Sequence, residues 1–311
     1  MKQCDVVIVG SGSAGSSSAI YATRFNLKTL VISGKLPGGL ITEALDVENY
    51  PGYLSINGME LANKFINQAK SLGAEFEYGE VTSIKKNNDS FVVEGLSEPI
   101  EARSIILAMG THHRKLGAVG ELEFAGKGVS YCATCDAPFY KNKVVLVVGG
   151  GNSAVEAAQD LSKHASKVYI AYRTSLKASP AYIDQLRKCP TVVELPGTNV
   201  VEICGDSSVN SVKLDNPYDN NDTLDVDGVF IQIGYIPSNK IATELGVLLT
   251  KNGYVKVDAG MGTSVSGVFC AGDLNNGSNM LHQQVTSASE GAIAAQSAYR
   301  YLSGFDYIIE E

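Results

Sequence analysis

Short apolar runs alternate with stretches of helical pattern along this chain. Residues 5–9 (DVVIV) are almost entirely apolar, as in a strand that is buried on both faces. A glycine-rich turn follows at 10–15 (GSGSAG), then a helical stretch over 18–22 and a second apolar run at 29–32. Together they form a strand–turn–helix–strand unit of about thirty residues. The sequence therefore predicts an α/β fold.

The same order of elements returns near the middle of the chain. Residues 144–148 predict a strand, 149–154 (GGGNSA) a second glycine turn, and a helix runs through Leu161 to a strand at 168–171. The small residues of the first turn recur 139 positions later, which indicates an internal repeat. They are Gly10, Gly12 and Gly15 in the first turn and Gly149, Gly151 and Ala154 in the second.

Small residues at these positions are what a dinucleotide site requires. The first lets the chain turn out of the strand, the second lets backbone approach a pyrophosphate, and the third lets the helix pack closely on the strand. The pyrophosphate then lies at the helix N-terminus, where unpaired N–H groups point toward it. Glycine turns without a ligand are the plainer alternative. We predict two dinucleotide sites, which also include Ser13, Ala14, Asn152 and Ser153.

A third segment indicates how the two units are connected. Residues 267–273 (GVFCAGD) predict a buried strand that ends in a Gly-Asp turn, and a helix follows over 286–295. We interpret this segment as the part of the first domain that returns to close over a large cofactor such as FAD. The second unit is then an insertion, which the chain enters and leaves through 108–111 and 233–237.

The chain has six cysteines, of which only Cys132 and Cys135 are close together. The other four are interpreted as small buried hydrophobic residues. Two thiols separated by two residues on an opening helical turn can close a disulfide, and a helix N-terminus lowers the pKa of a thiol there. Such pairs exchange electrons through a mixed disulfide. Asp136 is placed to donate or accept the protons of each turnover.

Three other interpretations of this motif remain open. A zinc site normally has four ligands, but there is no second Cys-x-x-Cys, and adjacent His112 and His113 would point in different directions. A purely structural disulfide is unusual in a reducing compartment. Asp136 could simply cap the helix. We expect a redox pair and no metal.

The predicted fold class is α/β with two Rossmann-like dinucleotide-binding domains, the second inserted into the first. The FAD-binding domain comprises 1–111 and 240–311. The domain at 112–239 binds the nicotinamide nucleotide and contains the cysteine pair. Residues 216–222 are predicted to be a polar hairpin loop.

Amino-acid composition argues against some classes of binding partner. Hydrophobic residues make up 44% of the 311 residues and charged residues 19%, which is typical of a folded globular chain. The net charge of −8 and the lack of a Lys/Arg-rich run argue against nucleic acid. No apolar run approaches the roughly 18 residues of a membrane span. Residues 1–5 lead directly into the first strand, so we expect no signal peptide and a cytoplasmic location.

These motifs together resemble the low-molecular-weight thioredoxin reductases over essentially the whole chain. The Cys-Ala-Thr-Cys tetrapeptide ahead of the second glycine turn is the most specific of them. The motifs are 10–15, 37–39 (PGG), 47–52 (VENYPG), 132–136 (CATCD), 149–154 and 272–273 (GD).

The resemblance implies a role for individual residues. FAD would lie across the first domain, with Asn49 near the isoalloxazine, Asp273 at the ribityl or phosphate region and Gln283 beside the ring. Cys135 would be the thiol nearest the flavin, Cys132 the one that attacks the thioredoxin disulfide, and Asp136 the acid. A homodimer is implied, with a rotation of one domain against the other. Gly39 and Gly272 complete the implied FAD site.

The sequence departs from this family where NADPH is recognised. NADPH-dependent members place His-Arg-Arg and a further Arg after the second strand of the inserted domain, and these arginines bind the 2′-phosphate. Here the segment is 172–178 (YRTSLKA), in which only Arg173 and Lys177 are cationic. Lysine offers a point charge instead of a bidentate fork, so we expect a weakened preference for NADPH over NADH.

Other electron donors remain alternatives for this reason. The same flavin and disulfide could be driven by NADH or by ferredoxin, or could act as a dithiol oxidase that uses oxygen. Leu40 and His282 replace the usual Gln and Arg near the flavin or the nicotinamide, and Ala137 follows the acid where Gly is common. The intact second glycine turn argues against complete loss of the nucleotide. A flavin sensor without catalysis would not need the cysteine pair.

Overall fold

The computed structural model describes residues 1–34, 37–44 and 47–304, and for Thr134 and Cys135 the backbone alone. The chain forms two compact units. The second unit, His113–Tyr235, is inserted between Met1–His112 and the residues from Ile236 onward. Its limits differ from the predicted 112–239 mainly at the C-terminal end.

The first unit is built on one mixed sheet. Its elements are β1 (Lys2–Val9), α1 (Ser13–Arg24), β2 (Thr29–Ser33), the 3-10 helix η1 (Gly39–Glu43), α2 (Gly58–Ser71), β3 (Glu75–Tyr78), β4 (Ser83–Asn87), β5 (Ser90–Glu94), β6 (Ile100–Leu107), β7 (Thr111–His113), β16 (Tyr235–Pro237), α6 (Lys240–Glu244), β17 (Val268–Cys270), the 3-10 helix η3 (Ser278–Met280) and α7 (Gln284–Ser303). The strand order is β3-β2-β1-β6-β5-β4, with β17 also paired to β6. Strands β1, β2, β3, β6 and β17 pair in parallel, and β4 and β5 form an antiparallel hairpin.

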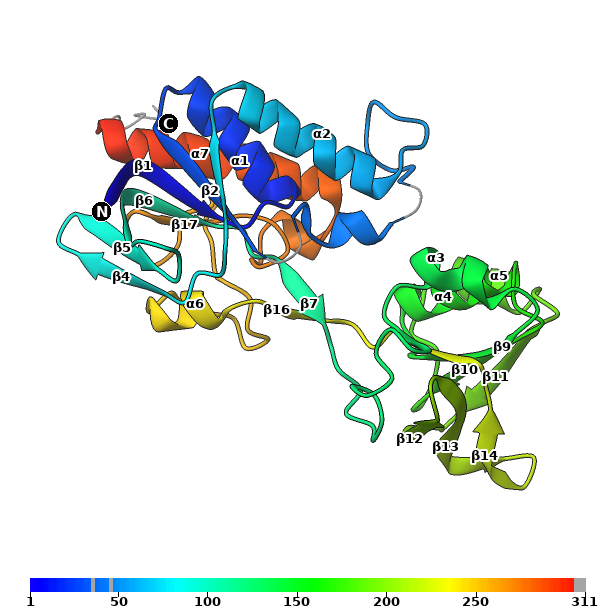
Figure 1. The fold of residues 1–311 in the computed structure, drawn as a ribbon. Helices are drawn as coiled ribbons and strands as arrows, with labels where there is room; N and C mark the ends of the chain where they lie inside the picture. The colour runs from blue at the N-terminus through cyan, green and yellow to red at the C-terminus, as the bar shows by residue number, and fades with distance from the viewer. Residues whose placement is uncertain (35–36, 45–46, 305–311) are drawn as a thin grey trace. The chain divides into compact units, whose positions relative to one another are not determined.

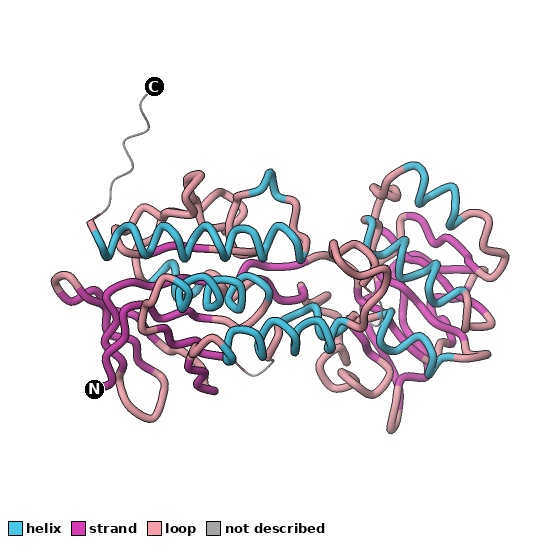
Figure 2. Tube along the Cα trace, turned by 90° about the horizontal axis from the view of Figure 1, so that it is seen from above, coloured by secondary structure: helices cyan, strands magenta, loops and turns pink. Residues whose placement is uncertain are grey.

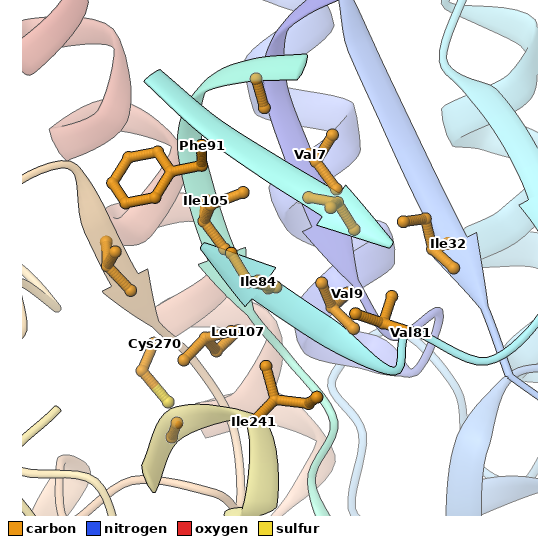
Figure 3. Close-up of a cluster of buried hydrophobic side chains, with 14 of the residues drawn as sticks. Val7, Val9, Ile32, Val81, Ile84, Phe91, Ile105, Leu107, Ile241 and Cys270 are labelled. Atoms are coloured by element: carbon orange, nitrogen blue, oxygen red, sulfur yellow. The ribbon is translucent and has the colours of Figure 1, made fainter. Parts of the chain in front are cut away.

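The two faces of β1 are covered by different elements (Figure 1). Val6 and Ile8 pack with alanines of α1 and α7, the long helix that leads to the C-terminus in Figure 2. Val7 and Val9 point to the opposite face, into the cluster with Phe91 that Figure 3 shows. Burial on both faces requires apolar residues at successive positions, which is the pattern that predicted this strand.

The second unit repeats the strand–turn–helix–strand order. Its elements are β8 (Val129–Ser130), α3 (Ala133–Asp136), the 3-10 helix η2 (Ala137–Tyr140), β9 (Val144–Val148), α4 (Asn152–Ser162), β10 (Lys167–Tyr172), α5 (Pro180–Leu186), β11 (Val192–Pro196), β12 (Val200–Gly205), β13 (Val209–Tyr218), β14 (Asn221–Asp225) and β15 (Gly228–Ile231). A parallel sheet has the order β11-β10-β9-β15-β8, and β12, β13 and β14 form an antiparallel sheet. The predicted α/β class with two Rossmann-like domains is confirmed.

The predicted hairpin loop at 216–222 is shorter than expected. Strand β13 continues to Tyr218 and β14 begins at Asn221, so the turn consists of Asp219 and Asn220. Both have positive φ angles, 54° and 62°. Two-residue hairpin turns require such angles, and Asp and Asn tolerate them better than most residues.

The chain passes between the units through β7 and β16, which pair with each other as a two-stranded sheet. These strands overlap the crossing segments predicted at 108–111 and 233–237. None of the helices in the described part of the chain combines the length and apolar character needed to cross a bilayer.

Candidate functional site

The first glycine turn brings α1 into close contact with the end of β1. Gly10 has a φ of +110°, and a Cβ added there would lie 2.2 Å from the carbonyl oxygen of Ala108. A Cβ added at Gly15 would lie 1.9 Å from the carbonyl oxygen of Gly10. Neither position accepts a side chain without displacing backbone. Gly15 therefore acts through packing, as predicted for the third small position.

A cavity of about 570 Å³ opens at this turn within the first unit. That volume lies in the usual range for a small-molecule or cofactor site, about 300–1,000 Å³. Helix α1 begins directly after Gly12, so its unpaired backbone N–H groups lie at the cavity wall. Leu40 also lines it. Of the predicted FAD residues, those that line the cavity are Gly10, Gly12, Ser13, Ala14, Gly39, Gly272 and Asp273.

Two further predicted FAD residues, Asn49 and Gln283, do not line the cavity but contact each other. The Asn49 Nδ2 donates to Gln283 Oε1 at 2.9 Å. Gln283 also precedes α7 and forms a capping box with Thr286. The structure thus joins the loop after η1 to the start of α7 through two residues that the resemblance had placed beside the same ring.

A buried carboxylate supports the Gly272–Asp273 turn. Glu290 on α7 is 4% exposed, and its Oε2 accepts from the backbone N–H of Gly272 and from Asn275 Nδ2, both at 2.8 Å. The sequence prediction missed Glu290. It was the one charged residue in the segment 286–295, whose other residues are small or apolar, and that isolation was the signal available.

Asp273 is a largely buried carboxyl in the cavity wall. Burial raises the pKa of its carboxyl, although a hydrogen bond from Ser287 Oγ at 3.0 Å acts in the opposite direction. A carboxylate here is desolvated, so hydroxyl donors of a ligand would find an acceptor that water satisfies poorly. Gln284, which also lines the cavity and accepts from the Ser13 hydroxyl, is a second wall residue that the sequence prediction missed.

The second glycine turn has the same design in the second unit. Helix α4 begins directly after Gly151, where an added Cβ would have no heavy atom within 4 Å. This open space is where a pyrophosphate would approach in the predicted arrangement. Ala154 is fully buried between α4 and the sheet. Gly149 has a φ of +143°, and Ser153 is exposed.

The segment that follows β10 folds back onto this turn. The backbone N–H of Lys177 donates to the Gly150 carbonyl at 2.6 Å, and the N–H of Ser179 donates to Asn152 Oδ1 at 2.8 Å. The side chains of Arg173 and Lys177 are exposed. Both predicted cations therefore belong to a segment that is fixed to the glycine turn by backbone hydrogen bonds.

The redox motif lies at the start of α3 in the second unit. Cys132 is disulfide-bonded, so its sulfur is not a zinc ligand in this state. Its backbone N–H donates to Ser130 Oγ at 3.0 Å. The side chain of Cys135 lies outside the described part of the chain. Asp136 ends α3 and is the N-cap residue of η2, where its side chain makes no capping hydrogen bond.

The remaining cysteines are all free thiols. Cys4 and Cys270 are buried, and burial raises the pKa of both. A raised pKa keeps these thiols protonated and unreactive, in agreement with the interpretation of them as small hydrophobic residues. Cys189 and Cys204 are partly exposed, contrary to that interpretation.

Comparison with known proteins relates this geometry to one family. A family model described as pyridine nucleotide-disulphide oxidoreductase matches residues 4–292. The chain is 41% identical over 309 residues to a thioredoxin reductase of Listeria innocua, covering 98% of this chain and 96% of that protein. It is 41% identical over 301 residues to that of Bacillus subtilis, covering 96% and 94%. The crystal structure of Lactococcus lactis thioredoxin reductase matches with a TM-score of 0.87 and 35% identity, over 97% of this chain and 100% of that one.

The raised pKa of Asp273 predicts a pH-dependent effect of Asp273→Asn on the ligand-free protein. The folded state binds the proton more tightly than the unfolded state, so ionised Asp273 destabilises the fold above its unfolded pKa, about 4. Asparagine keeps the acceptor for Ser287 and removes the charge. We expect the variant to be more stable than wild type at pH 7 and equally stable below pH ~4. Urea unfolding at both pH values measures this, and an equal gain at both would contradict it.

Proposed function

The chain belongs to the pyridine nucleotide-disulphide oxidoreductase family, and we propose that it is a thioredoxin reductase that uses FAD and NADPH. It is an oxidoreductase that depends on a flavin and a pyridine nucleotide. The observation that carries the proposal is the disulfide-bonded Cys132 at the start of α3, in a chain that resembles thioredoxin reductases over nearly its full length. The same likeness favours the nicotinamide route over ferredoxin or oxygen.

The cavity of the first unit has the features that FAD requires. The N-terminus of α1 offers unpaired N–H groups to a pyrophosphate, and Gly12 leaves room for it. Asp273 offers a desolvated acceptor to hydroxyl groups, in a turn that Glu290 fixes. When bound, the flavin would supply two-electron transfer between nicotinamide and disulfide. Asn49 and Gln283 are proposed to lie beside its ring.

The cysteine pair accounts for the exchange with thioredoxin. Reduction of the Cys132–Cys135 disulfide that we propose takes two electrons and two protons and yields two thiols. The Cys132 thiolate then attacks the disulfide of thioredoxin, and the second thiol resolves the mixed disulfide that forms. Asp136, at the end of the same helical turn, is proposed to hold and return one of the protons.

The second glycine turn is proposed to bind NADPH. Gly149, Gly151 and the start of α4 would receive the pyrophosphate. Arg173 and Lys177 are the cations available to the 2′-phosphate, and both are exposed on the segment anchored to this turn. With one guanidinium and one ammonium, discrimination against NADH would be weaker than with several arginines.

Replacement of Cys132 by serine tests the exchange step. We expect Cys132→Ser to lower thioredoxin reduction with NADPH by at least about a hundredfold, because the attacking sulfur is lost. Flavin reduction by NADPH should persist. Cys204→Ser, which removes a free thiol of the same unit, serves as the control and should keep full activity. Thioredoxin reduction by Cys132→Ser at the wild-type rate would exclude the mechanism.

The nucleotide assignment is tested by anaerobic mixing of the oxidised protein with NADPH or with NADH. Flavin absorbance should fall with both, and faster with NADPH. Lys177→Arg should increase the NADPH/NADH ratio of rate constants at low concentration about tenfold, because a fork replaces a point charge at the phosphate. Lys163→Arg is the control, because Lys163 is an exposed cation at the C-cap of α4, paired with Asp160. If dithiothreitol reduces the flavin and neither nucleotide does, the donor is not a nicotinamide.

Family resemblance also leads us to propose a homodimer. Sedimentation velocity should then give twice the chain mass of 32.9 kDa. A species of single chain mass at micromolar concentration would exclude a stable dimer.

A further inference from the structure

Tyr131, the residue before the disulfide-bonded Cys132, is fixed by a buried carboxylate. Its hydroxyl donates to Glu121 Oε1 at 2.7 Å, and Glu121 is 2% exposed. The same carboxylate accepts from the backbone N–H groups of Leu116 and Gly117, at 3.0 and 2.6 Å. With three donors, the buried charge is well compensated.

The ring of Tyr131 also packs against residues near the two ends of the second unit, where the chain passes through β7 and β16. Lys115 Nζ lies 3.8 Å from its centroid, within cation–π range. The ring of His113 lies 5.5 Å from that of Tyr131 and 5.0 Å from that of Tyr235. We call these residues the Tyr131 cluster: His113, Lys115, Glu121, Tyr131 and Tyr235.

The backbone on both sides of the ring is held as well. The carbonyl of Tyr131 accepts from Gln232 Nε2 at 2.8 Å. Ser130 Oγ accepts from the N–H of Cys132 at 3.0 Å and donates to the Cys132 carbonyl oxygen at 3.1 Å. The turn that leads into the disulfide is therefore fixed through its side chain and its main chain at three successive residues.

Such fixation acts differently on the two redox states. A disulfide tolerates a narrow range of backbone geometry, whereas two thiols tolerate a wide one. A turn already fixed in the bridged geometry holds the two sulfurs together and so favours their bond. Loosening the turn should shift the thiol–disulfide equilibrium toward the dithiol, because two separate thiols gain more conformational freedom than a disulfide does.

We propose that Tyr131, held by Glu121, is a positioning residue that stabilises the disulfide form of the Cys132 motif and so sets how easily it is reduced. The proposal rests on the redox role proposed above for this motif. Burial and the bond to Glu121 raise the pKa of Tyr131, so its hydroxyl remains a donor at working pH. None of the named residues besides Cys132 is required to exchange electrons.

The test is the thiol–disulfide equilibrium of Cys132 in the full flavin-loaded chain. The protein is equilibrated anaerobically with mixtures of reduced and oxidised dithiothreitol, in which each disulfide reduced takes two electrons and two protons from one dithiol. Alkylation and mass spectrometry then give the reduced fraction of Cys132. Neither NADPH nor thioredoxin is present, so failure of the proposed reductase activity would not affect the readout.

Tyr131→Phe and Glu121→Gln are the test variants. We expect both to shift the equilibrium about tenfold toward the dithiol, which corresponds to a potential about 30 mV less negative. Tyr172→Phe is the matched control, since Tyr172 donates to the partly buried Glu194 at 2.6 Å in the same unit, on β10. The Cys132 thiol–disulfide equilibrium of Tyr172→Phe should stay within about twofold of wild type.

A purely structural role gives a different result. If Tyr131 has only a structural role, Tyr131→Phe should lower the melting temperature just as Tyr172→Phe would. The Cys132 thiol–disulfide equilibrium of both variants should then stay within about twofold of wild type. That outcome, or a shift of either test variant toward the disulfide, overturns the proposal. If Glu121→Gln does not fold, Tyr131→Phe alone decides, because it keeps the ring and its packing against Lys115 and His113.

Discussion

Close packing of a helix onto the turn that precedes it is the constraint on which both proposed nucleotide sites depend. In the first unit, Gly15 of α1 approaches Gly10 so closely that no Cβ fits between them. This contact brings the helix N-terminus to the end of β1, next to the cavity. The second unit uses Ala154 at the same position, so its helix packs through a methyl group. In both units, the unpaired N–H groups of the helix N-terminus are therefore held at a fixed position.

Two buried carboxylates, Glu290 and Glu121, hold loop segments in place through hydrogen bonds. Glu290 accepts from the N–H of Gly272 and orders the turn that presents Asp273. Glu121 accepts from two backbone N–H groups and from Tyr131, beside Cys132. A loop without secondary structure has N–H groups that must find acceptors when they are buried. Glu121 satisfies two such N–H groups, and Glu290 satisfies one together with the Asn275 amide. In both places a residue proposed to act in function, Cys132 or Asp273, is next along the chain.

Burial also separates the cysteines by reactivity. Cys270 ends β17 in the first sheet and is fully buried, which raises the pKa of its thiol well above the usual value. Cys132 lies at the start of a short helix in the second unit and is disulfide-bonded. The chemistry of a thiol depends on the stability of its thiolate, so the surroundings of these sulfurs decide their roles. Spacing in the sequence had already distinguished the close pair from the isolated residues.

The sequence alone identified the two strand–turn–helix–strand units, the repeated turns and the cysteine pair, because each depends on residues that are neighbours along the chain. Apolar runs, small residues at fixed offsets and a Cys-x-x-Cys spacing are local patterns. Tertiary structure alone decided which distant side chains meet. Asn49 bonds to Gln283, and Glu121 takes the hydroxyl of Tyr131. Glu290 was missed for the same reason: a carboxylate shows its partner only once the fold has brought a turn from another part of the chain against it, and no local periodicity records that contact.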